Sequence, residues 1–158
     1  MNFFDLLISK IFGLFKNIEW YIQKKRFYNI FKNSTCDIGF NVRFFNSKNI
    51  VLGENIFFGD NVLINAGKGG KIYIGDNTAL AEGIKILSWL KDVQNQNVKQ
   101  KILGKDVFIG NNVRIGYNVI IMPGVKIGNN AKISPLSVVY NDIPSNGLAM
   151  GNPAEIIE

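Results

Sequence analysis

The stretch VFIGNNVRIGYNVIIMPGVKIGNNAKI, residues 107–133, decides the fold, because one pattern of side chains returns in it every six residues. An aliphatic residue recurs in seven consecutive hexapeptides, at Leu103, Ile109, Ile115, Ile121, Ile127, Ile133 and Val139. Four places after each of these comes a second apolar or small residue, at Val107, Val113, Val119, Val125, Ala131, Ser137 and Ile143. A period of six fits neither an α-helix nor an alternating strand.

The position between each such pair is occupied by residue types that suit a tight bend. In six of the seven repeats it is Asn, Asp or Gly, and the full set is Asp106, Asn112, Asn118, Gly124, Asn130, Leu136 and Asp142. These types tolerate a left-handed backbone better than most others. Each repeat therefore predicts a short β segment followed by a bend, and the whole run predicts a solenoid whose stacked coils bury their apolar side chains.

The same pattern occurs upstream, at residues 38–42, 52–56, 58–62, 74–78 and 80–84. It is interrupted once, from Trp89 to about Gln100, where no aliphatic residue returns at the sixth place. We therefore expect one coil of the solenoid to extrude a loop over about residues 89–101.

These repeats and the chain ending together resemble a known family. The ending is SVVYNDIPSNGLAMGNPAEII, residues 137–157. The resemblance covers residues 38–158 and is to the hexapeptide-repeat acyltransferase superfamily, most closely to the sugar O-acetyltransferases of capsule and lipopolysaccharide biosynthesis. It implies an all-β solenoid, a left-handed parallel β-helix with three flat faces. It also implies a homotrimer with acetyl-CoA as co-substrate, bound in a cleft between two subunits.

In the family that this chain resembles, a histidine at the extruded loop takes the proton from the acceptor hydroxyl. This sequence contains no histidine, and either Trp89 or Lys91 stands in its place. The nearest substitute bases are Asp92, Glu82 and Lys91. Burial would have to raise the pKa of either carboxyl group, and desolvation would have to lower that of the lysine.

The resemblance further implies that Asn65 orients the acceptor. We therefore take Asn65, Asp92 and Lys91 as catalytic candidates, with Trp89 and Ser88 as substrate-binding candidates, because an aromatic ring can stack on a sugar. Trp89 fits equally well as an aromatic that covers the side wall or a subunit seam. For Asp92, Glu82 and Lys91, the alternative is a role as surface residues exposed to solvent.

For acetyl-CoA, the resemblance implies contacts at Tyr117, Ser134, Pro135, Asn141 and Asn152. Several of these positions depart from the family pattern. Pro135 and Leu136 stand where small residues would let pantetheine pass, and Asn141 replaces a frequent lysine. Glu155 replaces a basic residue and would repel a phosphate group.

The first part of the chain, residues 1–32, reads as an amphipathic helix and a connector that precede the β-helix domain of residues 33–158. At 100° per residue over positions 2–23, the apolar residues gather on one side of a helix of five to six turns. Charged residues interrupt every long apolar run, so a membrane span is not predicted. Two alternatives remain. The helix packs on the protein or on a neighbouring subunit, or residues 2–28 contact a membrane peripherally, with Lys24, Lys25 and Arg26 near anionic headgroups.

Composition narrows the classes of function. The 158 residues carry a net charge of +6, but the lysines are scattered, so a nucleic-acid partner is not expected. The single cysteine, Cys36, and the lack of histidine argue against a disulfide and against a metal site. We predict a cytoplasmic acetyl-CoA-dependent O-acetyltransferase that acts on a sugar or glycan precursor. The alternative is a catalytically silent β-helix that serves as a binding or scaffold subunit.

Overall fold

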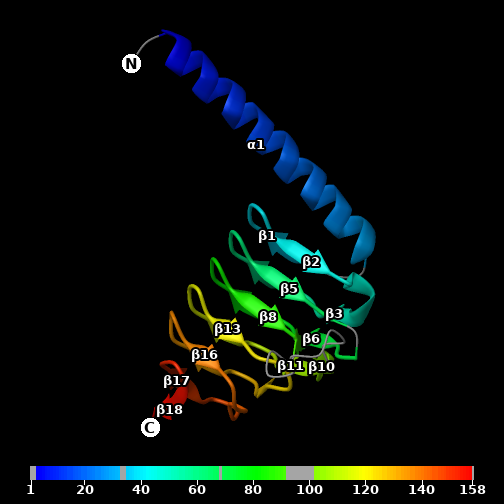
Figure 1. The fold of residues 1–158 in the computed structure, drawn as a ribbon, viewed down its shortest axis with the longest axis vertical. Helices are drawn as coiled ribbons and strands as arrows, with labels where there is room; N and C mark the ends of the chain where they lie inside the picture. The colour runs from blue at the N-terminus through cyan, green and yellow to red at the C-terminus, as the bar shows by residue number, and fades with distance from the viewer. Residues whose placement is uncertain (1–2, 33–34, 68, 92–101, 158) are drawn as a thin grey trace. The chain divides into compact units, whose positions relative to one another are not determined.

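The chain divides into two compact units, Met1–Lys32 and Asn33–Glu158. The structure is a computed structural model, and it describes residues 3–32, 35–67, 69–91 and 102–157. Asp92 and the other residues of 92–101 lie outside the described residues. The first unit is a helix and the second is a coil of short strands (Figure 1).

The second unit winds through three parallel sheets in a fixed order, A to B to C. Sheet A holds β1 (Cys36–Ile38), β4 (Ile56–Phe58), β7 (Ala79–Leu80), β12 (Arg114–Ile115), β15 (Lys132–Ile133), β17 (Leu148–Met150) and, antiparallel at its end, β18 (Glu155–Ile157). Sheet B holds β2 (Arg43–Phe45), β5 (Leu63–Asn65), β8 (Lys85–Leu87), β13 (Ile120–Ile121) and β16 (Val138–Val139). Sheet C holds β3 (Ile50–Leu52), preceded by the short helix η1 (Ser47–Asn49), then β6 (Ile72–Ile74), β11 (Val107–Ile109) and β14 (Lys126–Ile127).

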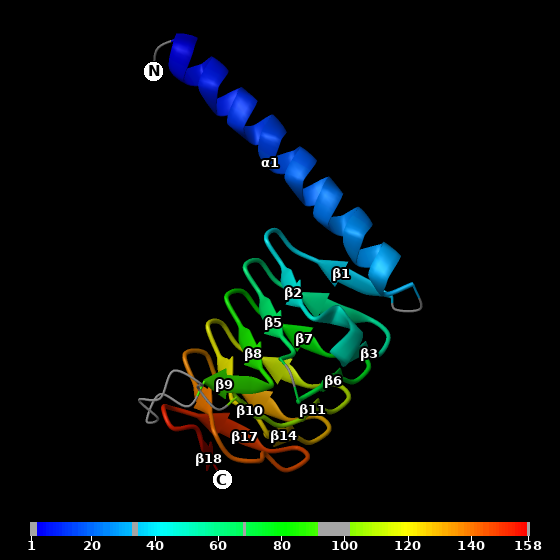
Figure 2. The ribbon, with the colours of Figure 1, turned by 45° about the vertical axis from the view of Figure 1, so that its right-hand side comes forward.

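Each strand lies against the strand one coil away, so the sheets form the flat walls of a triangular prism (Figure 2). The aliphatic residue that recurs at each sixth place points inward and is buried from Ile109 to Val139. The second position of each repeat, from Val107 to Ile143, is buried as well. This confirms the predicted period of six, because each six-residue repeat forms one strand of a wall and one bend. Leu103 differs, because it pairs with Leu90 outside the three walls.

Asparagine and aspartate side chains hold the bends of successive coils together. Asn118 and Asn130 have φ values of 55° and 60°, as the bend composition predicts. Amide side chains donate to the amide of the next coil, for example Asn41 Nδ2 to Asn61 Oδ1 at 2.8 Å and Asn130 Nδ2 to Asn146 Oδ1 at 3.1 Å. These polar ladders satisfy groups that an apolar bend would leave unpaired.

Leu136 is the exception among these bends, since it takes a φ of 63° with a side chain that is 71% exposed. A leucine in this conformation is strained by roughly 1–2 kcal/mol, whereas Asn adopts it more readily. We expect Leu136→Asn to raise the melting temperature by about 2–4 °C, measured by differential scanning fluorimetry. Leu148→Asn, which places the same change on a strand, should not stabilise. A lower melting temperature for Leu136→Asn would contradict the strain argument.

The first unit is a single helix, α1 (Phe3–Ile30), of 28 residues. It is longer than the five to six turns predicted over residues 2–23, because Lys24–Ile30 contains no proline or glycine to end it. Its aliphatic, phenylalanine and tyrosine side chains from Leu7 to Ile22 are exposed. In the described part of the chain, no helix combines the length and the apolar character that a bilayer span requires.

Candidate active site

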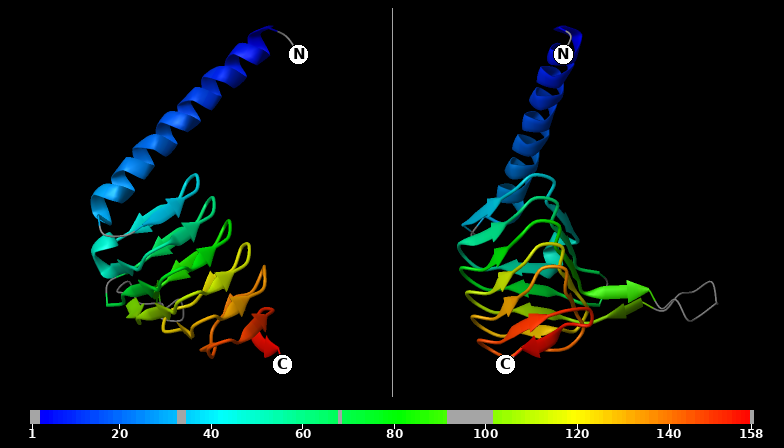
Figure 3. Two further views of the ribbon diagram at one scale, coloured as in Figure 1. Left: turned by 180° about the vertical axis from the view of Figure 1, so that it is seen from behind. Right: turned by 90° about the vertical axis from the view of Figure 1, so that its left-hand side faces the viewer.

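An antiparallel arm leaves the prism at the edge between sheets B and C. After β8 the chain runs outward as β9 (Trp89–Lys91) and returns as β10 (Ile102–Gly104), with Trp89 opposite Gly104. Figure 3 shows these two strands projecting sideways from the stack of coils. The predicted extrusion at residues 89–101 therefore begins with β9, and its paired strand β10 lies directly after the predicted range, a feature that periodicity alone did not indicate.

Two predicted site residues meet at the base of this arm. The indole Nε1 of Trp89 donates a hydrogen bond to Oδ1 of Asn65 at 3.0 Å. Because that oxygen accepts from the indole, the Nδ2 group of Asn65 is the part of the amide left to donate elsewhere. No hydrogen bond from Nδ2 to another described residue is present. Both side chains are half-buried, so a ligand at this edge can reach them.

Gly67 provides the surface on which the Trp89 indole lies. A Cβ added to Gly67 would fall 1.8 Å from Cδ1 and 1.9 Å from Cγ of Trp89, a distance that real atoms do not adopt. The carbonyl oxygen of Gly67 also accepts from Asn49 Nδ2 at 3.3 Å. The glycine is therefore required for the position of the indole.

Gly67→Ala should displace the Trp89 ring and lower kcat/KM of any reaction that uses this ring by about 10–100-fold, since misplacement by about an ångström has costs of this order. In a Trp20→Phe background, the displaced indole should also show red-shifted emission. Gly13→Ala is the control, because a Cβ there meets nothing within 4 Å. Unchanged emission and activity in Gly67→Ala would show that the indole does not depend on this glycine.

Ser88 has a different role from the predicted contact with substrate. Its side chain is fully buried, its Oγ accepts from Gly67 N–H at 3.0 Å, and it donates to the Gly70 carbonyl at 3.0 Å. The Ser88 carbonyl in turn accepts from the Lys105 N–H at 2.9 Å. Both hydrogen-bonding functions of the hydroxyl are used inside the protein, so Ser88 positions the backbone that carries Asn65 and Trp89.

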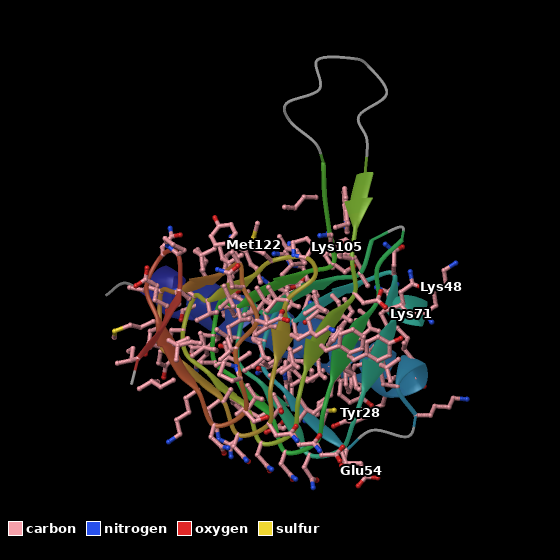
Figure 4. The ribbon with its side chains drawn as sticks, turned by 90° about the horizontal axis from the view of Figure 1, so that it is seen from below. Tyr28, Lys48, Glu54, Lys71, Lys105 and Met122 are labelled. Atoms are coloured by element: carbon pink, nitrogen blue, oxygen red, sulfur yellow. The ribbon has the colours of Figure 1, made fainter. Side chains whose placement is uncertain are left out.

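Lys105 is a cation of this edge that the sequence pattern did not single out. It follows directly on β10, and its side chain extends over Gly124, where an added Cβ would lie 2.9 Å from Lys105 Cδ. Figure 4 shows Lys105 and Met122 on the side of the prism from which the arm leaves. Its sequence signal was its place shortly after the interruption, between Leu103 and Val107 of the resumed repeat.

The predicted acetyl-CoA contacts fall in two groups. Tyr117 and Pro135 lie in bends between sheets A and B on neighbouring coils, where the Pro135 ring packs over Gly116. Ser134 adjoins them, and its N–H donates to the Ala149 carbonyl on the coil of Asn152. Asn141 instead follows β16, at the edge between sheets B and C, the same edge as the arm. Within one chain, sheet B separates Tyr117, Ser134 and Pro135 from the pair Asn65 and Trp89.

A groove of about 400 Å³ lies on the outer face of sheet A, beside the bends that carry Tyr117 and Pro135. Its lining includes Arg114, Lys132 and Ser134, together with the apolar Phe57 and Leu148. Arg114 and Lys132 are paired in register on β12 and β15, which places two cations side by side. Sequence reasoning missed both, although each precedes an inward isoleucine and so occupies an outward position.

Among the described residues, the other nucleophilic or ligating groups do not form a second site. Cys36 is buried, and this burial raises the pKa of its thiol to about 11, which leaves it protonated and a poor nucleophile near neutral pH. Across the described residues, no three His, Cys, Asp or Glu side chains are grouped as metal ligands. Lys91 lies at the end of β9, and the second charged candidate, Asp92, is outside the described residues.

Comparison with known proteins finds relatives that are hexapeptide-repeat transferases and acetyltransferases. Residues 106–141 match the family described as bacterial transferase hexapeptide (six repeats). The crystal structure of a maltose O-acetyltransferase from Clostridium difficile 630 has a TM-score of 0.75 and 35% identity, over 95% of this chain and 82% of that chain. A galactoside acetyltransferase in complex with coenzyme A has a TM-score of 0.68 and 31% identity, over 85% of this chain and 70% of its own.

A third relative is similar along almost the whole chain. The protein WbbJ of Escherichia coli K12, described as a lipopolysaccharide biosynthesis O-acetyl transferase, is 27% identical over 169 residues, which cover 98% of this chain and 84% of that protein. Other curated relatives are 35–40% identical, and the chain spans only 54–58% of their length.

The three-walled coil, together with the family match and the structural relatives, fits a left-handed parallel β-helix, as the resemblance to the family implies. The chain belongs to the hexapeptide-repeat acyltransferase superfamily.

Proposed function

We propose that this protein is an O-acetyltransferase that moves the acetyl group of acetyl-CoA to a hydroxyl of a sugar or glycan precursor. The observation that carries the proposal is the hydrogen-bonded pair of Trp89 and Asn65 at the base of the arm. It combines a flat apolar ring, suited to stacking on a sugar, with an amide donor beside it. Membership of the acyltransferase superfamily, and a related enzyme's complex with coenzyme A, support the choice of donor.

In the proposed reaction, the acceptor oxygen attacks the thioester carbonyl carbon, the C–S bond breaks, and the hydroxyl proton ends on the CoA thiol. The Nδ2 group of Asn65 donates to the oxygen on which negative charge develops, which is the largest single contribution in many acyl transfers. Trp89 holds the sugar ring. Asp92 and Lys91 remain our candidates for the base that takes the hydroxyl proton, in place of the histidine that the sequence lacks.

Acetyl-CoA is the proposed co-substrate, and the groove on sheet A has chemistry that suits part of it. Arg114 and Lys132 present two positive charges beside an apolar lining. This combination suits a ligand that carries both phosphate groups and a long, largely apolar chain. The ring of Pro135 takes up space in the bend beside the groove. The carboxylate of Glu155 would repel a phosphate group that lay close to that carboxylate. We therefore place the phosphates at Arg114 and Lys132 rather than near Glu155.

We infer a homotrimer, and the placement of the two groups of residues supports a site that is shared between subunits. Sheet B separates Tyr117 and Pro135 from Asn65 and Trp89 within one chain, so one chain's residues do not converge on a single thioester. In a cyclic trimer, the edge that carries Asn65 and Trp89 in one subunit would face the edge that carries Tyr117 and Pro135 in its neighbour. We infer that the complete site is composed of two subunits, and that it works in the cytoplasm, where acetyl-CoA is available.

Binding and turnover of acetyl-CoA test this function. Millimolar acetyl-CoA should raise the melting temperature of the purified protein, and free CoA thiol should appear when an acceptor sugar is supplied. Stabilisation by acetyl-CoA, without release of CoA thiol in the presence of any nucleotide sugar or glycan, would favour the alternative, a silent binding subunit. The lack of both effects would exclude acetyl-CoA as the donor.

The composite site has its own test, in which two inactive variants are co-expressed with different tags. Trp89→Ala and Arg114→Glu subunits should each give little activity alone. Mixed trimers purified through both tags should recover activity, because some interfaces then pair two intact edges. If mixed trimers stay as inactive as the parents, each site is contained in one chain.

A further inference from the structure

Helix α1 carries an exposed face that the proposed acetyl transfer does not use. At 100° per residue, the apolar side chains gather within a sector of about 140°. They are Leu7, Ile8, Ile11, Leu14, Phe15, Ile18, Tyr21 and Ile22, each between 43% and 65% exposed. We call this set the apolar face. An exposed apolar surface of this length marks a site of interaction.

The charge of the helical unit favours an anionic partner. Residues 1–32 contain six basic and two acidic residues, so they carry most of the chain's net charge of +6. Lys25 and Arg26 are exposed, and at 100° per residue they continue the apolar face after Ile22. One side of the helix therefore passes from apolar to cationic along its length.

The position of Phe12 next to the apolar face fits a lipid surface better than a second helix. Phe12 is 69% exposed and lies beside the apolar face rather than within it. Trp20 lies on the polar side, where the ammonium group of Lys24 is 4.7 Å from the centre of its ring. Paired helices would bury Lys25 on the shared side and leave Phe12 in water. At a lipid surface, basic groups meet headgroups while aromatic rings enter the interface.

We propose that α1 lies on an anionic lipid surface, with its apolar face among the acyl chains and Lys24, Lys25 and Arg26 at the headgroups. This contact is independent of the proposed acetyl transfer. It attaches the enzyme to a membrane reversibly, because one amphipathic helix binds much more weakly than a spanning helix.

Sedimentation of the full chain with vesicles tests the proposal. Vesicles of phosphatidylcholine with 30% phosphatidylglycerol should bind the protein at least tenfold more tightly than vesicles of pure phosphatidylcholine. Near an anionic surface, each basic residue contributes about fivefold in affinity. Lys25→Gln/Arg26→Gln should therefore weaken binding to anionic vesicles by about 25-fold. Lys85→Gln/Lys126→Gln removes the same charge from exposed positions of the β-helix and is the matched control.

A second variant separates the lipid surface from other occupants of the apolar face. Leu14→Gln/Ile18→Gln keeps the charge and should lower vesicle binding tenfold or more. Leu148→Gln/Ile156→Gln, also at exposed positions, should not. Circular dichroism and the mass in solution report whether each variant stays folded and keeps its assembly. Equal binding to both vesicle types, or a Leu14→Gln/Ile18→Gln variant that changes the mass in solution but not vesicle binding, would overturn the proposal.

Discussion

Asn65→Asp is expected to lower kcat by about 10²–10³-fold, the loss seen when a single donor to a developing oxyanion is removed. The aspartate keeps an oxygen that can accept from Trp89 Nε1, so the indole should stay in place. What disappears is the Nδ2 donor, and a negative charge takes its place next to the reacting carbonyl. Steady-state release of CoA thiol with saturating acetyl-CoA measures this effect.

Two comparisons make the result specific to the donor. Asn61→Asp makes the same chemical change on the same coil at another bend, where the side-chain oxygen accepts from Asn41, and it should leave kcat unchanged. Asn65→Ala removes the donor and the acceptor together and should lose at least as much activity as Asn65→Asp. If Asn65→Asp is fully active while Asn65→Ala is not, Asn65 acts only by holding Trp89.

Phe58→Ala is expected to destabilise the β-helix by about 3–5 kcal/mol, the cost of removing a buried aromatic ring that its surroundings cannot replace. Phe58 is 0% exposed on β4, and its ring meets that of Phe44 edge to face at 5.5 Å between centroids. The coil is closed above and below by other coils, so the cavity has little freedom to collapse. Urea unfolding at a fixed protein concentration measures the loss.

The adjacent residue supplies the control. Phe57 precedes Phe58 on the same strand, points outward and is 47% exposed. Phe57→Ala removes the same number of atoms but creates no internal cavity, so it should cost much less stability. Equal losses for the two variants would mean that outward residues of sheet A contribute as much to stability as the inward ones.

The repeat made most of the fold predictable, because side-chain direction in a coil depends on local order along the chain. Isoleucine or valine at each sixth place had to point inward, and residues such as Ile115 and Ile133 do so. The exceptions come where the local pattern no longer controls direction. Leu103 keeps the period but belongs to the arm, where its partner is Leu90. Helix α1 continues past Gln23 because no breaking residue follows.

The sequence singled out some residues of the candidate site but did not indicate the contacts between them. Asn65 and Trp89 were both singled out, yet 24 positions separate them, and nothing in the sequence indicated a hydrogen bond between them. Ser88 was assigned to substrate, whereas its hydroxyl is used twice inside the protein. Lys105 and the cations of sheet A were missed, since a lysine in an outward position looks the same along the whole chain.

By itself, the sequence determined the period, the inward and outward sides of each coil, the place of the interruption and the lack of an imidazole base. Those features follow from the order of neighbouring residues, which fixes local backbone direction. Only the tertiary structure decided which side chains face each other across coils, because stacking joins residues 16 to 35 positions apart in register. The distance of Trp89 from Asn65, the glycine beneath its ring and the separation of the two groups of site residues by sheet B all depend on that stacking.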